Sequence, residues 1–508
     1  MNKILNTFLF FFPFLLILFI FNKSFFKKII YYSFPIAILF CLTISYDGTY
    51  RPDAGSYHLP FISILNENKI LIGINNIHFR FGHTSIIQYL SAIYNNYIFT
   101  EKGILIPSGL IYCNFVGYCI YEIFQNKNRN FHKILIFILL IFVIFRVNRY
   151  SDFGNDAPAN LIFFYLIIES TRDSEIFLKI KKTIFASTFI FLNKITLLFA
   201  FLIPIYFIFK NFRIKRLVNK ISITCLLFII LYTGKNILIS GCIMFPVEQT
   251  CISKLFWYDK NSKRASNAVN ARLENEAWTK GWMDQSGNKK NYEQFLINFN
   301  WTKTWVSSEG KKIIKKTFPF FVFLLILYIL LLYSEKLIIQ KDEKKIKLPN
   351  EYYLCAIVSI FGSILWFLKF PVFRYGYGYL ISLISIIILL NIKNFKIIFD
   401  DAKLIKALKY TLIILLIGIS SKNLIRISKN SKLDFNVWPN IYNSGNKFEK
   451  LENLKIKKDN ETLFYKSKIS ECYYSKSPCT HFYNGNDFTL DEIDMKIVYG
   501  YKIYYFIR

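Results

Sequence analysis

Acidic residues are scarce in this chain. Asp and Glu number 33 against 64 Lys and Arg in 508 residues, which gives a formal net charge of +31. A nucleic-acid-binding protein would gather such charge on one basic face of a soluble module, and the sequence contains no such module. The lysines accompany abundant Ile, Asn, Phe and Tyr, a composition that an AT-rich genome produces. The charge excess therefore predicts no nucleic-acid partner.

Several architectures are excluded by missing patterns. The sequence has no solenoid-type repeat and no low-complexity linker. It also lacks the alternating ten-residue strands of a membrane β-barrel. No small-residue cleavage site follows the first apolar run, because "FNKSFFKK" comes next. We therefore expect that run to be a retained span rather than a signal peptide.

What the chain does have is apolar blocks. Hydrophobic residues make up 54% of it, and blocks such as "FPFFVFLLILYILLLY" approach the roughly 20 residues that cross a bilayer. We therefore predict an all-α polytopic membrane protein. The expected helices, about twelve, are 5–21, 29–46, 105–124, 134–147, 159–170, 183–193, 195–209, 220–238, 318–334, 351–367, 377–391 and 407–420.

Charge between the blocks predicts their orientation. The short basic connections, such as 127–133 and 210–220, belong in the cytoplasm by the positive-inside rule, which places both termini outside. Residues 1–420 then form a transmembrane domain with outward loops at 47–104, 146–158 and 239–317. Residues 84–99 are either an interfacial helix or an extra span. Residues 421–508 are expected to form a small α+β periplasmic element.

Cysteine supplies an independent argument about sidedness. Five of the nine cysteines lie in apolar blocks, where they are expected to pack as small hydrophobes. The other four form two close pairs in outward segments, Cys242 with Cys251 and Cys472 with Cys479. Such pairs indicate disulfides in an oxidising compartment. The alternative, free or zinc-binding thiols, lacks the expected spacing and neighbouring His.

Charged side chains gather on the predicted outward side. The carboxylates are Asp47, Asp53, Asp152 and Asp156, and the cations include Lys194 and Arg374. Charges at a membrane are candidates for function. An Asp can take a proton from a hydroxyl nucleophile, and Arg or Lys can stabilise a departing phosphate. These groups suit the transfer of a sugar from a lipid phosphate.

Four segments resemble the GT-C class of membrane glycosyltransferases. An acidic residue precedes "YHLP" after an early span, and "SDFGNDAPANLIFFYLI" is similar to the second acidic loop of that class. "FLNKITLLFAFLIP" resembles its short span pair with a central Lys. "WFLKFPVFRYGYGYL" resembles a late Pro-x-x-Arg-Tyr segment of related bacterial proteins. The resemblance covers roughly residues 29 to 390.

The resemblance implies an inverting transfer from a polyprenyl-phosphate-linked sugar on the outer face of a bacterial inner (plasma) membrane. The acceptor would be a cell-envelope glycan, lipid or protein. Asp53 would be the base, Asp156 the second acidic residue, and Lys194 and Arg374 the phosphate partners. Ala54 stands where many members have a second acid, which leaves open a divalent metal (Mg or Mn) and the choice of Asp53 over Asp47.

The remaining substrate-binding candidates are Tyr57, His58 and Asp152, together with Asp47. Each main candidate also has a plainer interpretation. Asp53 and Asp156 could be helix caps, and Arg374 could extend to the membrane interface. Two other functions stay open: a polysaccharide polymerase or ligase that uses Arg and His without an Asp base, and a transporter of lipid-linked glycans.

Overall fold

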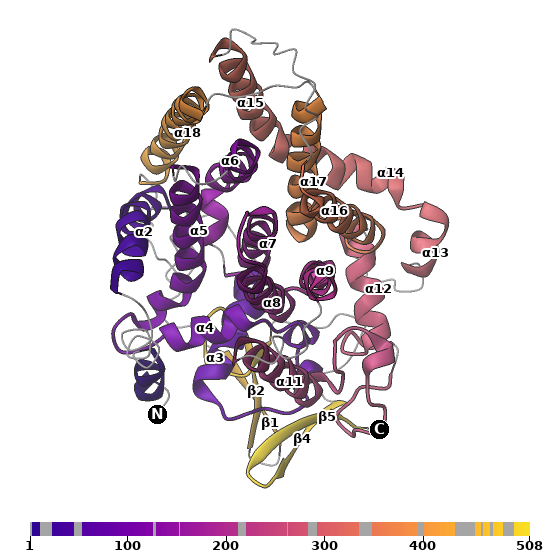
Figure 1. Cartoon of the computed structure of the whole chain (residues 1–508). Helices are drawn as coiled ribbons and strands as arrows, with labels where there is room; N and C mark the ends of the chain where they lie inside the picture. The colour runs from indigo at the N-terminus through magenta and orange to yellow at the C-terminus, as the bar shows by residue number, and fades with distance from the viewer. Residues whose placement is uncertain are drawn as a thin grey trace.

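The structure is a computed structural model. It describes residues 3–10, 23–44, 53–124, 129–151, 153–211, 220–261, 263–282, 292–334, 348–394, 401–431, 453–458, 461–467, 471–480 and 492–507. The chain is mostly helical, with a small group of strands at one end (Figure 1). The longer helices are α2 (Lys23–Ile44), α5 (Ile106–Phe124), α6 (Asn130–Phe145), α7 (Asp156–Thr171), α8 (Ile176–Asn193), α9 (Leu202–Lys210), α11 (Lys220–Ser240), α12 (Ala268–Thr279), α15 (Lys311–Ser334), α16 (Asn350–Lys369), α17 (Phe373–Asn394) and α18 (Asp401–Asn430).

Six stretches of helix in the described part are long and apolar enough to cross a membrane. They are 100–124, 220–240, 302–330, 350–369, 373–391 and 402–430. Each overlaps a predicted span, so the helical membrane class is supported. Three shorter apolar stretches, 31–44, 130–145 and 195–210, overlap three further predicted spans. The predicted span 5–21 lies mostly outside the described residues.

Helix α7 lies at the centre of the bundle. It packs against α5, α6, α8 and α17, and apolar side chains all round it are buried, as Phe163, Phe164 and Ile167 illustrate. A helix that is hydrophobic on every side is a core helix. By contrast, α11 and α15 expose large apolar side chains such as Leu226 and Phe318. Those exposed faces are the ones suited to lipid.

The first outward segment folds into short pieces. These include a π-helical turn η1 (Ala54–His58), α3 (Leu59–Glu67), η3 (Phe79–Gly82) and α4 (Ile86–Tyr94). Helix α4 has nine residues, a length of roughly 14 Å, which is about half of a bilayer core. The 84–99 stretch therefore does not form a spanning helix.

The C-terminal element consists of strands in the part that the structure describes. Strands β1 (Asn453–Lys458), β2 (Glu461–Ser467) and β3 (Cys479–Thr480) form one sheet, and β4 (Ile493–Val498) pairs antiparallel with β5 (Tyr501–Phe506). The helical part of the expected α+β element is not seen among these residues. The preceding helix α18 continues to Asn430, past the expected boundary at 420.

Both ends of the described chain dock on the first outward segment. Ile72 pairs with Ile503 of β5, and Gly73 lies so close to the Tyr504 carbonyl that a Cβ would collide with it. Gly73 also has a φ of +68°, which favours glycine. At the other end, Asn6 donates hydrogen bonds to the carbonyls of Ala92 and Asn95. The two ends therefore lie on the same side of the bundle, in agreement with Figure 1.

Candidate functional site

A cavity of about 150 Å³ lies at the end of the bundle where α7 begins and α8 ends. It is lined by six of the residues predicted from sequence: Asp53, Tyr57, His58, Asp156, Lys194 and Arg374. These six come from four segments far apart in the chain. Asp47 and Asp152 lie outside the described residues. The cavity is the place where the acidic and basic candidates meet.

Arg374 joins the two acidic loops. Its guanidinium lies 2.8 Å from an Asp53 carboxylate oxygen and 3.5 Å from one of Asp156. All three side chains are partly buried, with Asp156 the least exposed. Arg374 thus forms an ion-paired bridge across the cavity. It does not simply extend to the membrane interface, which was the plainer interpretation of this residue.

The position of Arg374 is set by Asn160, a fully buried residue one turn into α7. The Asn160 amide nitrogen donates to the Arg374 carbonyl at 3.1 Å, and its oxygen accepts from the Gly378 backbone at 2.8 Å. A Cβ at Gly378 would lie 2.6 Å from that oxygen, so glycine permits the close approach of α17. Asn160 therefore fixes α17 against α7 and places Arg374 beside Asp156.

Lys194 completes the charged cluster from the end of α8. The helix ends at Asn193, and Lys194 adopts an extended backbone. Its ammonium lies 2.6 Å from the second Asp156 oxygen and 3.7 Å from the centre of the Tyr375 ring. Asp156 thus binds one cation with each oxygen. It is the first residue of α7, whose N-cap is Asn155, so the capping alternative for Asp156 does not apply.

Asp53 stands at the start of η1, yet its side chain makes no capping hydrogen bond. Its carboxylate turns to Arg374 instead. Burial of the carboxyl group favours the neutral form, but the charges of Arg374, His58 and Arg80 outweigh that effect, and the pKa of Asp53 lies below its ordinary value. Asp53 is therefore ionised throughout the neutral pH range.

Tyr57 and His58 form one wall of the cavity. Their rings lie 4.3 Å apart, and the buried His58 has its Nδ1 3.3 Å from the Gln88 amide nitrogen. Burial, together with the Asp53 charge, raises the pKa of Tyr57 well above its usual range. Tyr57 is therefore a neutral hydroxyl, able to donate a hydrogen bond to a ligand.

The site residues chosen from the sequence did not include several residues that line the cavity. Arg80 lies over the Tyr57 ring at 5.7 Å, and among the described residues no carboxylate pairs with it. His83 is buried, and burial together with the charges of Arg80 and Lys194 lowers its pKa to about 3. Both lie in "IHFRFGH", where the signal was a cluster of His and Arg without helical spacing.

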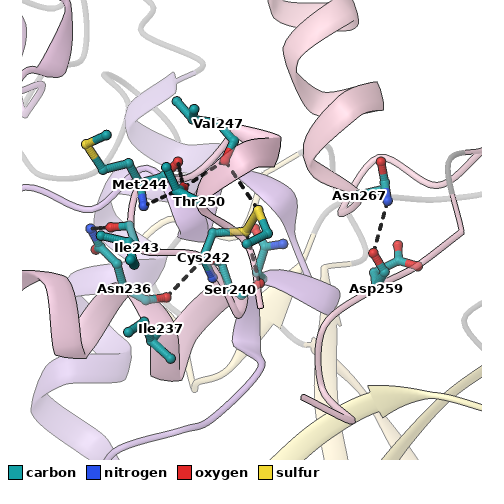
Figure 2. Close-up of a disulfide and its surroundings, with 12 residues drawn as sticks. Asn236, Ile237, Ser240, Cys242, Ile243, Met244, Val247, Thr250, Asp259 and Asn267 are labelled. Atoms are coloured by element: carbon teal, nitrogen blue, oxygen red, sulfur yellow. Dashed lines mark hydrogen bonds between the residues drawn. A yellow bond between two sulfur atoms is a disulfide. The ribbon is translucent and has the colours of Figure 1, made fainter. Parts of the chain in front are cut away.

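The Cys242–Cys251 disulfide supports the opposite wall, as predicted for that pair. Figure 2 shows the short loop that it closes, with the Asn236 amide donating to the Ile243 carbonyl at 2.9 Å. Phe245 of this loop packs edge-on against His83 at 5.3 Å and lines the cavity. The disulfide thus holds cavity residues in place from outside the bundle.

The predicted Cys472–Cys479 disulfide is also formed, and its loop packs on the helix that carries Tyr57 and His58. The Tyr473 amide donates to the Gly55 carbonyl at 2.8 Å, and a Cβ at Gly55 would lie 2.8 Å from the Tyr473 ring. Tyr474 accepts hydrogen bonds from Asn66 and Asn95. The C-terminal element therefore clamps η1 and α3.

The described residues do not fit a divalent metal at this cavity. No group of three His, Cys, Asp or Glu side chains among them is arranged to hold an ion. The two carboxylates that line the cavity are already paired with Arg374 and Lys194. We therefore derive no step through a metal.

Comparison with known protein families assigns the chain to one of them. Residues 2–381 match the family described as a domain of unknown function (DUF8201). The chain belongs to that family. The match includes every lining residue of the cavity and ends within α17, before the C-terminal strands. No curated protein and no solved structure matches the chain.

Proposed function

We propose that the protein is a glycosyltransferase that moves a sugar from a polyprenyl-phosphate-linked donor to a cell-envelope acceptor, with inversion at the anomeric carbon. The observation that carries the proposal is the convergence of Asp53, Asp156, Lys194 and Arg374 in one cavity at the end of an apolar helix bundle. A carboxylate beside clustered cations matches the two needs of such a reaction, a base and a phosphate site.

In this mechanism, Asp53 accepts the proton of the acceptor hydroxyl as its oxygen attacks the anomeric carbon. The bond from that carbon to the phosphate oxygen breaks, and the polyprenyl phosphate leaves with its electron pair. Arg374 and Lys194 stabilise the charge that develops on it. Because Arg374 binds Asp53 before the donor arrives, a phosphate that attracts the guanidinium also releases the carboxylate and raises its basicity.

The topology that goes with this proposal has twelve spans and a periplasmic or extracellular cavity. The two disulfides support that side, because both lie at the cavity end and disulfides persist in oxidising compartments. The nine-residue α4 also supports this orientation of the spans. An extra span at 84–99 would place every later loop on the opposite side of the membrane.

The deciding experiment is the envelope glycan profile of cells carrying Asp53→Asn, compared with wild type and a deletion strain. We expect the variant to reach the membrane at a normal level and to lack the same sugar as the deletion strain. Asp494→Asn is the matched control, because Asp494 lies in β4 and does not line the cavity. Normal glycans in the Asp53 variant would reject Asp53 as the base.

A second candidate is a polysaccharide polymerase or ligase that uses Arg and His without an Asp base. The Arg374–Asp53 pair favours it, because an ion-paired carboxylate with a lowered pKa is a weaker base. This reading predicts that His58→Gln abolishes the product while Asp53→Asn retains it. The glycosyltransferase hypothesis predicts that Asp53→Asn loses more product than His58→Gln.

A further inference from the structure

A second cavity, of about 230 Å³, lies at the other end of α7. The first cavity is lined by Asp156 at the start of this helix, and the second by Thr171 at its end. Sixteen helical residues separate the two by roughly 24 Å. Nothing in the proposed transfer reaction uses the second cavity, so its chemistry needs its own explanation.

Three helices begin at this cavity. Residues in or beside the first turn of α6, α8 and α16 line it, among them His132, Lys179 and Glu351. No side chain of the N-cap residues Arg129, Glu175 or Pro349 makes a capping hydrogen bond. Each helix N-terminus carries a partial positive charge and outward-facing N–H groups. Three such ends around one cavity favour an anion.

The charges in the cavity are unevenly matched. Arg129 pairs with Asp173 at 3.0 Å, Glu351 pairs with Lys210 at 3.0 Å, and Arg172 pairs with Glu122 at 3.0 Å. Lys179 is only 6% exposed, and among the described residues no carboxylate lies within ion-pair distance of it. The Phe207 ring lies 5.2 Å from the ammonium, and the carboxylates of Glu351 and Asp173 act on it from beyond ion-pair distance.

A buried nitrogen atom at this cavity has no hydrogen-bond partner among the described residues. His132 is 3% exposed; its Nδ1 lies 3.3 Å from the Thr171 hydroxyl, and its Nε2 has no hydrogen-bond partner among the described residues. A largely buried ammonium that makes no direct ion pair and a buried nitrogen without a hydrogen-bond partner among the described residues both cost free energy. Both belong to residues that line this cavity, and a bound anion would accept from the ammonium and from the Nε2–H tautomer of His132.

We propose that this cavity binds a phosphate group, with Lys179 as its principal charge partner and Arg129 and Arg172 as guanidinium donors. Phosphate matches the guanidinium fork and has enough oxygens to meet several N–H groups at once. The source that fits best is the headgroup of an anionic membrane phospholipid. Phe131, Leu348 and Tyr352 line the same cavity and offer apolar contacts to the adjoining acyl chains.

The test uses the full-length protein in detergent, with dioleoyl phosphatidylglycerol, dioleoyl phosphatidylcholine and inorganic phosphate as three separate probes. Native mass spectrometry measures binding, and the melting temperature reports stabilisation by ligand. We expect the wild type to bind the anionic lipid in preference to the zwitterionic one. Lys179→Gln should weaken that binding by roughly tenfold to a hundredfold, the effect of a lost charged hydrogen bond.

Lys181→Gln is the matched control. It removes the same charge from the same helix, but Lys181 does not line the cavity. Lys179→Met adds a readout that a purely structural lysine would not produce. Without ligand it should melt at or above the wild-type temperature, because it removes an unpaired buried charge. With the anionic lipid the wild type should gain stability that Lys179→Met does not gain.

The three probes separate the sources of phosphate. Saturable, Lys179-dependent binding of the phospholipid supports a headgroup site. The same dependence for inorganic phosphate, with the lipid unable to compete, supports the site but assigns it a soluble ligand. Equal binding by wild type and Lys179→Gln, or an equal loss in Lys181→Gln, would overturn the proposal.

Discussion

The two cavities at the ends of α7 differ in how their charges are balanced. At the Asp156 end, two carboxylates are paired with Arg374 and Lys194 before any ligand arrives, and Arg80 lines the same cavity without an ion pair among the described residues. At the Thr171 end, Asp173, Glu351 and Glu122 each pair with a cation, and among the described residues no carboxylate lies within ion-pair distance of Lys179. A paired cluster can exchange partners during a reaction, whereas an uncompensated cation is suited to holding a ligand. In our proposals, the first cavity carries out the transfer and the second holds a ligand.

The largest expected effect comes from breaking the bridge in the first cavity. Arg374→Gln removes the charge that both carboxylates share, and we expect transfer to fall by about 10²- to 10³-fold, as when one charge-stabilising donor is lost. Turnover of a lipid-linked donor in membranes measures it. Lys369→Gln, an exposed lysine at the end of α16 that does not line the cavity, is the control. Retained activity in Arg374→Gln would mean that the bridge is only structural.

The dependence of folded stability on acid pH should distinguish the contribution of His83 from that of Asp53. The folded pKa of His83, about 3, lies below that of the unfolded chain, so the unfolded state binds more protons between roughly pH 6.5 and 3, and folded stability falls as pH drops through that window. His83→Gln should therefore be less acid-sensitive than wild type, by on the order of a few kcal/mol at pH 4. Melting temperatures from pH 7 to pH 3.5 measure it, and parallel curves would contradict it.

Asp53 also makes the fold less stable as pH falls, but in a lower pH window than His83. The folded pKa of Asp53 is lowered, so its contribution to stability is present above the unfolded pKa and disappears as pH falls through the folded value. The difference in melting temperature between wild type and Asp53→Asn should hence stay constant from pH 5 to 8 and shrink only below about pH 4. This serves as the reference curve for the His83 experiment.

Removing the C-terminal disulfide should have a smaller effect that is confined to the first cavity. Cys472→Ser with Cys479→Ser opens a short loop, which costs about 2 kcal/mol in the chain-entropy estimate. The clamp on Gly55 and Asn66 loosens, so proteolysis around α3 should increase while phospholipid binding at the Lys179 cavity stays unchanged. A parallel loss at both cavities would show that the bundle itself is affected.

The smallest expected effect is the interaction energy between one substitution in each cavity, which should be close to zero. Asp53 and Lys179 line the two cavities at opposite ends of the 16-residue helix α7. The effects of Asp53→Asn and Lys179→Gln on the free energy of unfolding should therefore add within about 0.5 kcal/mol. A double-mutant cycle on the purified protein measures it. A larger interaction energy would mean that the two cavities communicate through α7, which would break the comparison drawn above.

The sequence predicted the charged residues of the site better than their surroundings. Asp53, Asp156, Lys194 and Arg374 stood out because charge is costly beside apolar blocks. Asn160 did not, because a neutral side chain inside an apolar helix gives no signal until α17, more than 200 residues later, is packed against it. The short helices α7 and α8 show the same limit: length and composition do not determine whether a buried helix crosses the bilayer.

The docking of the C-terminal strands has a consequence for how the protein is made. Gly55 contacts Tyr473, and Ile72 pairs with Ile503, so segments that leave the ribosome early wait for more than 400 residues before their partners are synthesised. The walls that hold Tyr57 and His58 are completed only after the last strand has been delivered and Cys472–Cys479 has been oxidised. A chain that ends before β5 would carry every charged residue of the first cavity without the strands that align them. The same holds for a chain whose C-terminal segment stays in a reducing compartment, where Cys472 and Cys479 do not form their disulfide.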